Sequence, residues 1–138
     1  MKTILITGST DGIGLETAKM LAAQGHSLLL HGRNQAKLEA AEKAVCGQSE
    51  TARVEIYTAD LSRIGDVESL ANAVKDKHDR LDVLINNAGV FKTPDPIQED
   101  GLDVRFVVNV LAPCLLTKRL LPLMDASGRC LLYTSDAA

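Results

Sequence analysis

Short apolar runs alternate along the chain with longer stretches in which apolar residues recur every three or four positions. The short runs are β-branched or leucine-rich and predict strands at Thr3–Thr7, Leu28–His31, Val54–Thr58 and Leu81–Ile85, with a fifth strand that begins near Gly128. The stretches between them predict amphipathic helices whose apolar faces are Leu15/Ala18/Leu21/Ala22, Leu38/Ala41/Val45 and Val67/Leu70/Ala71/Val74. A long, mostly apolar helix that contains Pro113 is expected from Asp103 to Met124.

The order of these elements indicates the fold class. Strands that alternate with helices predict βαβ units and a parallel sheet. Right-handed crossovers leave few topologies, of which a Rossmann-type doubly wound α/β sheet is the simplest. Capping residues support the helix boundaries: Asn34 and Asp66 stand where N-caps are expected, and Gly25 and Gly47 where two helices end.

Composition excludes several classes of protein. The chain has 138 residues, a net charge of −3 and 3% aromatic residues, which argues against nucleic-acid binding. No apolar run approaches the roughly 18 residues of a membrane helix. The three cysteines fit neither a disulfide framework nor a zinc site, which favours a reducing cytoplasmic location. Cys46 and Cys114 are expected to be buried, the three histidines (His26, His31 and His78) to lie at the surface, and no metal site is expected.

A glycine-rich turn joins the first strand to the first helix. It is the segment from Gly8 to Gly14, with a third glycine at position 12. Glycines allow a tight turn and a close approach of backbone N–H groups to a pyrophosphate, and the start of the helix adds unpaired donors. Because the turn lies between a strand and a helix, it predicts a nucleotide site, although glycines in loops are often only turn chemistry.

Four motifs follow one another along the chain. They are Thr7-Gly8-x-x-x-Gly12-Ile13-Gly14, Asp60-Leu61, Asn86-Asn87-Ala88-Gly89 and Asn109 within Phe106–Pro113. In this order and spacing they resemble the signature of the short-chain dehydrogenase/reductase family, over the stretch from Thr3 to about Arg129. The segment Glu99–Phe106 is similar to that of members related to retinol dehydrogenases, which hints at an apolar alcohol or carbonyl substrate.

The resemblance implies a role for each motif. Gly8, Gly12, Ile13 and Gly14 would hold the pyrophosphate, and Ser9 and Asp11 of the same turn would also bind the cofactor. Asp60 and Leu61 would line the adenine pocket, and Asn87, Ala88 and Gly89 would border the adenosine ribose. Asn86 is interpreted instead as a structural amide that ties neighbouring strands. Asn109 would be catalytic, holding a water of the proton relay through its main-chain carbonyl.

The residue type after the second strand bears on the cofactor. An acidic residue about 20 positions beyond the glycines would bind the ribose 2′-OH, whereas an arginine accommodates a 2′-phosphate. Here that position is Arg33, and Gly32 stands where family members that prefer NAD carry an acid. We therefore expect NADP rather than NAD, although Arg33 could also be an ordinary solvated arginine.

Pro113 supplies a second line of reasoning about Asn109. A proline inside a helix removes the hydrogen bond to the carbonyl four residues back, which would be that of Asn109. The freed carbonyl would then be available to a water. The alternative is that Pro113 merely kinks a packing helix.

The family's catalytic Tyr-x-x-x-Lys pair is missing from the sequence. Tyr57 is followed four residues later by Leu61, and Tyr133 by Ala137, so neither tyrosine forms the pair. Residues 130–138 can be encoded by a string that resembles a transposon-end sequencing adapter, and we expect them to be a non-native tail. Ser135, in that tail, is taken to be unrelated to the family's catalytic serine. Residues 1–129 would then be the dinucleotide-binding front part of a longer single-domain enzyme, with four to five strands of its sheet.

Three hypotheses about function result. The first is an NADP-dependent oxidoreductase that transfers hydride between the nicotinamide and a small alcohol or carbonyl substrate, as a homodimer or homotetramer, with the present chain itself inactive. The second is a non-catalytic dinucleotide-binding sensor of the same fold. The third, a flavodoxin-like binder of flavin or phosphate, leaves the Asn-Asn-Ala-Gly motif unexplained.

Overall fold

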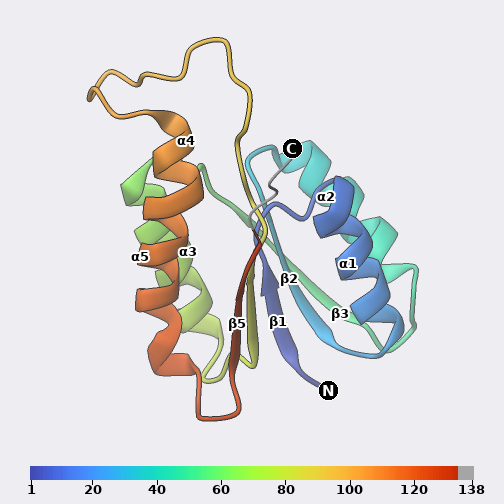
Figure 1. The fold of residues 1–138 in the computed structure, drawn as a ribbon. Coiled ribbons are helices and arrows are strands. Elements are labelled where there is room, and N and C mark those ends of the chain that lie inside the picture. Colours follow the sequence, from blue (N-terminus) through green and yellow to red (C-terminus); the bar gives the residue numbers. More distant parts are fainter. Residues whose placement is uncertain (134–138) are drawn as a thin grey trace.

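The computed structural model describes residues 1–133, which form five strands and the helices that connect them (Figure 1). Residues 134–138, part of the expected non-native tail, lie outside the described residues. The elements are β1 (Thr3–Ile6), α1 (Gly12–Ala23), β2 (Ser27–Gly32), α2 (Gln35–Cys46), β3 (Arg53–Thr58), α3 (Ile64–Lys77), β4 (Val83–Asn86), α4 (Val104–Phe106), α5 (Ala112–Leu120) and β5 (Arg129–Leu132).

All strand pairs are parallel, and the order across the sheet is β3-β2-β1-β4-β5. The chain moves outward from β1 to β3 and then returns to the other side of β1 for β4. This reversal makes the junction of β1 and β4 a topological switch point, where ligands of open α/β sheets bind at the carboxyl ends of the strands. The predicted Rossmann-type fold is confirmed.

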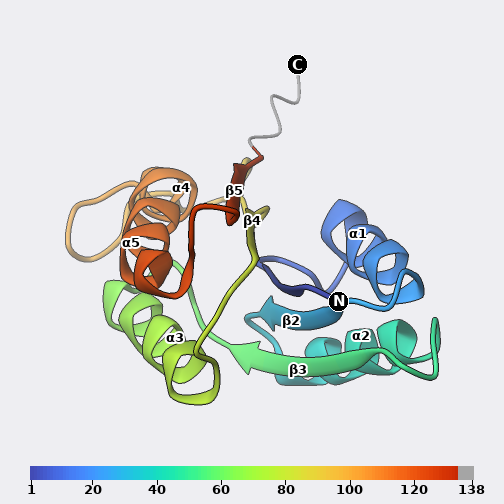
Figure 2. The ribbon, with the colours of Figure 1, turned by 90° about the horizontal axis from the view of Figure 1, so that it is seen from below.

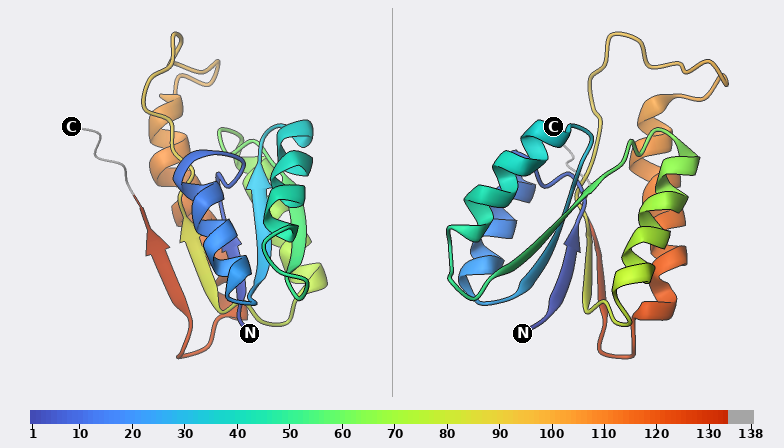
Figure 3. Two further views of the ribbon diagram at one scale, coloured as in Figure 1. Left: turned by 90° about the vertical axis from the view of Figure 1, so that its right-hand side faces the viewer. Right: turned by 180° about the vertical axis from the view of Figure 1, so that it is seen from behind.

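Helices cover both faces of the sheet (Figures 2 and 3). α1 and α2 pack on one face over Ile4, Ile6, Leu28 and Leu30, and α3 and α5 pack on the other over Leu5, Leu29 and Leu84. β2 is buried along its whole length, whereas all four residues of β5 are exposed. The sheet is therefore buried at β1 and β2 and exposed at β5.

Several local predictions are confirmed and one is wrong. The Asn34 side chain caps α2 by accepting from the Lys37 N–H at 3.0 Å, and Gly25, which follows the C-cap residue Gln24 of α1, adopts a positive φ of 85°. Asp66 does not cap α3, because the helix begins two residues earlier, at Ile64. The Asp66 carboxylate instead lies in the first turn and accepts from the backbone N–H of Asp60 at 2.9 Å.

The predicted long helix is interrupted. A π-helical turn, Val107–Leu111, separates α4 from α5, and a 3₁₀ turn, Leu121–Leu123, follows α5. The whole segment Val104–Leu123 has 20 residues, and its most apolar 18-residue window has a mean hydropathy of 1.5 and is 28% buried, so by length and composition alone the segment could cross a membrane. A core helix of a soluble protein can meet the same criteria, so the observation is weak evidence, and the absence of a membrane segment stays a prediction.

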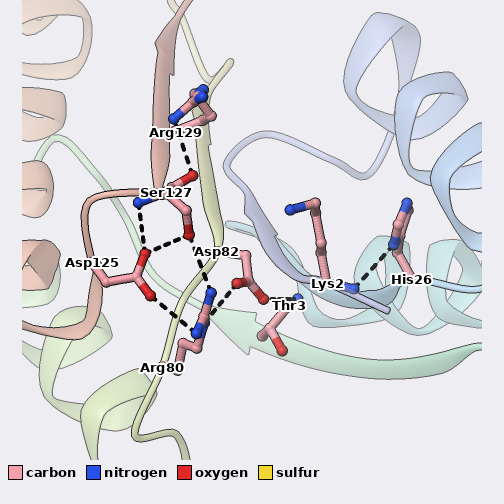
Figure 4. Close-up of polar contacts among 8 residues, drawn as sticks. All are labelled: Lys2, Thr3, His26, Arg80, Asp82, Asp125, Ser127 and Arg129. Atoms are coloured by element: carbon pink, nitrogen blue, oxygen red, sulfur yellow. Dashed lines mark hydrogen bonds and ion pairs between the residues drawn. The ribbon is translucent and has the colours of Figure 1, made fainter.

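Charged side chains hold the amino ends of three strands together (Figure 4). The Asp82 carboxylate accepts from the Thr3 N–H at 2.8 Å and from Arg80 Nε at 2.8 Å. The Asp82 main-chain carbonyl accepts from the Arg129 N–H at 2.9 Å, and Arg80 also pairs with Asp125 at 3.0 Å. Asp82 thus links the starts of β1, β4 and β5.

Candidate dinucleotide site

A cavity of about 910 Å³ lies at the carboxyl ends of the strands, beside the junction of β1 and β4. All the predicted site residues except Ser9 line it: Gly8, Asp11, Gly12, Ile13, Gly14, Arg33, Asp60, Leu61, Asn87, Ala88, Gly89 and Asn109. They come from five separate segments of the chain, so the fold gathers at one place what the sequence distributes over about a hundred positions.

The glycine turn depends on two close approaches of the backbone. Gly8 has a φ of 63°, and a Cβ there would lie 2.8 Å from the Cα of Ala88, which is backbone and cannot move aside. A Cβ on Gly14 would meet the carbonyl oxygen of Gly8 and the side-chain amide of Asn87. Only glycine fits at either position, and the resulting concave backbone is a cradle of the kind that binds pyrophosphate.

Asn87 fastens this turn to the loop after β4. Its Nδ2 donates to the carbonyls of Thr7 at 3.1 Å and Gly8 at 3.0 Å, while the Thr7 hydroxyl accepts from the N–H groups of Asn87 and Ala88, both at 3.0 Å. The side-chain amide of Asn87 therefore bonds to the protein, and beside a ribose Asn87 would serve as part of the cavity wall. Asn86 is buried, and its Nδ2 donates to the Thr117 hydroxyl of α5 at 3.2 Å and to Cys130 Sγ of the neighbouring β5 at 3.6 Å, which supports the interpretation of Asn86 as a structural amide.

Ser9 and His31 form the floor under the turn. Ser9 is fully buried and donates from Oγ to the Ile6 carbonyl at 2.9 Å, so it does not line the cavity. His31 is 2% exposed, which overturns the expectation that all three histidines lie at the surface. Its ring faces the Gly8 N–H on one side and the Ala59 carbonyl on the other. The signal available in the sequence was its position inside a strand buried on both faces.

Asp60 lies at the adenine side implied by the family resemblance. Its Oδ1 accepts from the Ser62 N–H at 2.9 Å and from the Ser62 hydroxyl at 2.7 Å. Burial would raise the pKa of Asp60, but the hydrogen bonds from Ser62 and the charges of Arg33 and Arg63 outweigh burial and lower the pKa. A carboxylate held in this state can accept a hydrogen bond from an amine.

Two cations stand at the rim of the cavity. Arg33 directly follows β2, and Lys37 lies in the first turn of α2, whose start Asn34 caps. Among residues 1–133, neither cation takes part in a salt bridge. Lys37 was missed by the sequence reasoning, although its spacing of four residues from Arg33 across a helix start could have indicated it.

Asn109 lies in the π-helical turn and holds the loop after β4. Its Oδ1 accepts from the Val90 N–H and its Nδ2 donates to the Val90 carbonyl, each at 2.8 Å. Ala112 donates to the carbonyl of Val107, five residues back, so counting four residues back from Pro113 no longer identifies the carbonyl that the proline frees. The proposed role of the Asn109 carbonyl therefore rests on the resemblance alone.

The remaining candidates lie elsewhere or act otherwise. Tyr57 is 7% exposed, donates to Glu55 at 2.6 Å and is not part of the cavity wall. Cys46 and Cys114 are exposed, contrary to expectation. Within the described residues, no group of three or more His, Cys, Asp or Glu side chains could hold a metal ion. Sequence reasoning also missed several residues of the cavity wall: Thr10, Ser62, Val90, Phe91, Val104, Val108, Leu132 and Tyr133.

Comparison with known proteins identifies the family. The family model for short chain dehydrogenases matches residues 2–138, and the chain belongs to that family. It is 38% identical over 127 residues to human retinol dehydrogenase 13, covering 92% of this chain and 38% of the relative. The chain thus spans well under half the length of that relative.

Two solved structures show the same fold. A metagenomic short-chain oxidoreductase in complex with NADP is 31% identical, with a TM-score of 0.77, and the match covers 88% of this chain and 55% of that one. A short-chain dehydrogenase from Sphingobium yanoikuyae in complex with NADPH is 30% identical, with a TM-score of 0.76, and the match covers 88% of this chain and 48% of that one.

Proposed function

We propose that the whole protein is an NADP-dependent oxidoreductase that transfers hydride between the nicotinamide and an alcohol or carbonyl carbon. The observation that carries the proposal is the cavity at the β1–β4 switch point, whose wall contains the glycine turn that Gly8 and Gly14 allow to pack closely on Ala88 and Asn87. The two similar structures in complex with NADP or NADPH support this choice of ligand.

The chain's own residues fit such a cofactor. The glycine turn offers backbone N–H groups and the start of α1 to the pyrophosphate, and Asp60 offers a carboxylate to the adenine amine. Ala88 and Gly89 have small side chains or none on the opposite wall, and Asn87 holds the backbone of this wall against Thr7 and Gly8. When bound, the nicotinamide ring supplies or accepts the hydride. Asn109 positions the loop after β4 next to this site.

Preference for the phosphorylated cofactor is inferred from the end of β2. Arg33 presents a planar guanidinium that can bind a phosphate with two hydrogen bonds, and Lys37 adds a second positive charge. A Cβ on Gly32 would collide with the Thr10 side chain, so an acidic residue, the group that binds a free ribose 2′-OH, does not fit there as the turn stands.

Binding of the two cofactors to the full chain tests this assignment. Arg33→Asp should weaken NADP⁺ binding by about tenfold or more, because it replaces a bidentate phosphate contact by repulsion, and should leave NAD⁺ binding nearly unchanged. Arg53→Asp makes the same charge change at the exposed start of β3 and is the matched control. Tighter binding of NAD⁺ than of NADP⁺ by the wild type, with an unaltered ratio in Arg33→Asp, would contradict the assignment.

A dinucleotide-binding sensor remains the second candidate. Within the 138 given residues neither Tyr57 nor Tyr133 is followed by a lysine four residues later, so these residues do not distinguish the sensor from the enzyme. We infer that the chain as given has no turnover, and that residues 1–129 are the cofactor-binding part while residues 130–138 are non-native. Genomic sequence beyond the Arg129 codon distinguishes the candidates: a Tyr-x-x-x-Lys pair there supports the enzyme, and its absence supports the sensor.

Assembly and location complete the proposal. Phe106, Val110 and Leu121 are each about half exposed along the α4–α5 segment. An apolar face of this kind is typical of subunit contacts, and we propose that the whole protein is a homodimer or homotetramer. A cytoplasmic location and a small apolar alcohol or carbonyl substrate stay predictions.

A further inference from the structure

We propose that His31, with its ring hydrogen on Nε2, is a positioning residue that sets the spacing between the pyrophosphate and adenine parts of the site. The proposal rests on the proposed dinucleotide binding. It concerns a buried side chain that contacts two loops and would act on the cofactor through those loops.

The geometry places the His31 ring between two segments, the glycine turn and the loop at Ala59. It lies near the end of β2, at a strand position buried on both faces. Nδ1 is 3.1 Å from the backbone nitrogen of Gly8 in the glycine turn, and Nε2 is 2.9 Å from the carbonyl oxygen of Ala59. Ala59 directly precedes Asp60. The imidazole ring is therefore a rigid spacer between the turn offered to the pyrophosphate and the loop offered to the adenine.

These contacts fix the tautomer. The Gly8 N–H can only donate, so Nδ1 must accept, and the Ala59 carbonyl can only accept, so Nε2 must carry the hydrogen. A second proton on Nδ1 would point at the Gly8 N–H and break that contact. Burial lowers the pKa of His31 and Arg33 lowers it further, whereas the bond to Ala59 and the charge of Asp60 raise it; burial dominates, which keeps the ring uncharged near neutral pH.

Other hydrogen bonds preserve the strands when the ring is lost. The Ser9 N–H donates to the His31 carbonyl at 2.9 Å, and the Ala59 N–H donates to the Gly32 carbonyl at 3.1 Å, and both are main-chain contacts. A substitution at position 31 should therefore disturb the spacing of the two loops more than the sheet itself. A ligand that touches both loops must be affected more than a ligand that touches one.

Two substitutions separate the two ends of the ring. In His31→Asn, the side-chain oxygen takes the place of Nδ1 and keeps an acceptor for Gly8. In His31→Gln, the side-chain nitrogen takes the place of Nε2 and keeps a donor for Ala59. Neither side chain titrates near neutral pH, and His31→Ala removes both contacts.

The test compares NADP⁺, which spans both loops, with adenosine 2′-monophosphate, which lacks the pyrophosphate. In the full chain, His31→Gln and His31→Ala should weaken NADP⁺ binding by about tenfold, the equivalent of one buried hydrogen bond, and His31→Asn by clearly less. Binding of adenosine 2′-monophosphate should change by less than about twofold in all three. Long-range ¹H–¹⁵N spectra of the wild type should show hydrogen on Nε2 and none on Nδ1.

Each other outcome has a definite meaning. If the wild type does not bind NADP⁺, the proposed function is wrong. If it binds NADP⁺ but the three variants weaken both ligands equally, His31 serves general stability and the inference is overturned. Equal losses in His31→Asn and His31→Ala, or hydrogen on Nδ1 in the wild-type spectrum, also overturn it, and the spectrum does so even if every variant fails to fold.

Discussion

The two ends of the sheet are built in opposite ways. At the amino ends, charged side chains satisfy one another: the Asp82 carboxylate, with its side chain 13% exposed, accepts from both Thr3 and Arg80 (Figure 4). At the carboxyl ends, the cavity wall includes five glycines among larger polar and apolar side chains, and the cations Arg33 and Lys37 are unpaired among residues 1–133.

This difference separates structural from binding chemistry. A charged group that already has partners stabilises the fold and has few hydrogen bonds left for a ligand. A cation without a partner, or a backbone without side chains, is free to bind one. Substitutions at the amino ends should therefore change stability without changing cofactor affinity. Substitutions at the carboxyl ends should act through backbone space and through ligand charge.

The largest effect is expected at Gly8. Gly8→Ala combines a positive φ with a Cβ that would lie 2.8 Å from the Ala88 backbone, and should reduce the free energy of unfolding by about 2–4 kcal/mol. Gly12→Ala is the matched control, because Gly12 also has a positive φ, 55°, but a Cβ there meets nothing within 4 Å. Strain alone should cost the control about 1 kcal/mol, measured by urea denaturation. Equal losses would show that the close approach to Ala88 is unimportant.

The next effect is expected at Asp82, at the other end. Asp82→Asn should cost about 1–3 kcal/mol of stability, because it weakens charge-assisted bonds to Thr3 and Arg80, and should leave NADP⁺ affinity unchanged. Asp79→Asn, at an exposed neighbouring position, should be nearly neutral. A loss of NADP⁺ affinity in Asp82→Asn that matches the loss of stability would erase the distinction between the two ends.

The same carboxylate predicts a pH dependence. The Thr3 N–H, and after it the bond from Arg80, lower the pKa of Asp82 in the folded chain. A lowered folded-state pKa contributes stability above the unfolded value of about 3.9, and this contribution is lost as the pH falls through the folded-state pKa. The difference in stability between the wild type and Asp82→Asn should thus be constant near neutral pH and shrink below about pH 4. A difference that does not change with pH would contradict the pKa shift.

The smallest effect is expected at Gly32. Gly32→Asp alone should raise NAD⁺ affinity by less than about twofold, because the Thr10 side chain occupies the space that the new Cβ needs. Thr10→Ala removes that methyl group and leaves the Thr10 Cβ at an ordinary contact distance of 3.7 Å. The double variant Thr10→Ala/Gly32→Asp should gain more NAD⁺ affinity than the sum of the single changes, as measured by calorimetry. Full gain from Gly32→Asp alone would show that Thr10 does not restrict the position.

The sequence was sufficient for the periodic elements and for the motifs at strand ends. The parallel, doubly wound sheet followed from the alternation of strands and helices, and Asn34 caps its helix because a side-chain cap is a local interaction. His31 was wrongly expected at the surface, because nothing in the local sequence shows that the glycine turn covers this end of its strand. Asp66 was misassigned as a cap because its partner, the Asp60 backbone, belongs to a loop that precedes the helix. The π-helical turn at Asn109 depends on packing that no local pattern records.

Calorimetric titration of the full chain with NADP⁺ and NAD⁺ tests the central claim most directly. The carboxyl-end cavity, with Arg33 and Lys37 at its rim, predicts saturable 1:1 binding of NADP⁺ at least about tenfold tighter than that of NAD⁺, unchanged in Asp82→Asn and abolished or reversed in Arg33→Asp. Absence of dinucleotide binding by a folded chain, or a preference for NAD⁺ that Arg33→Asp leaves unaltered, would contradict it.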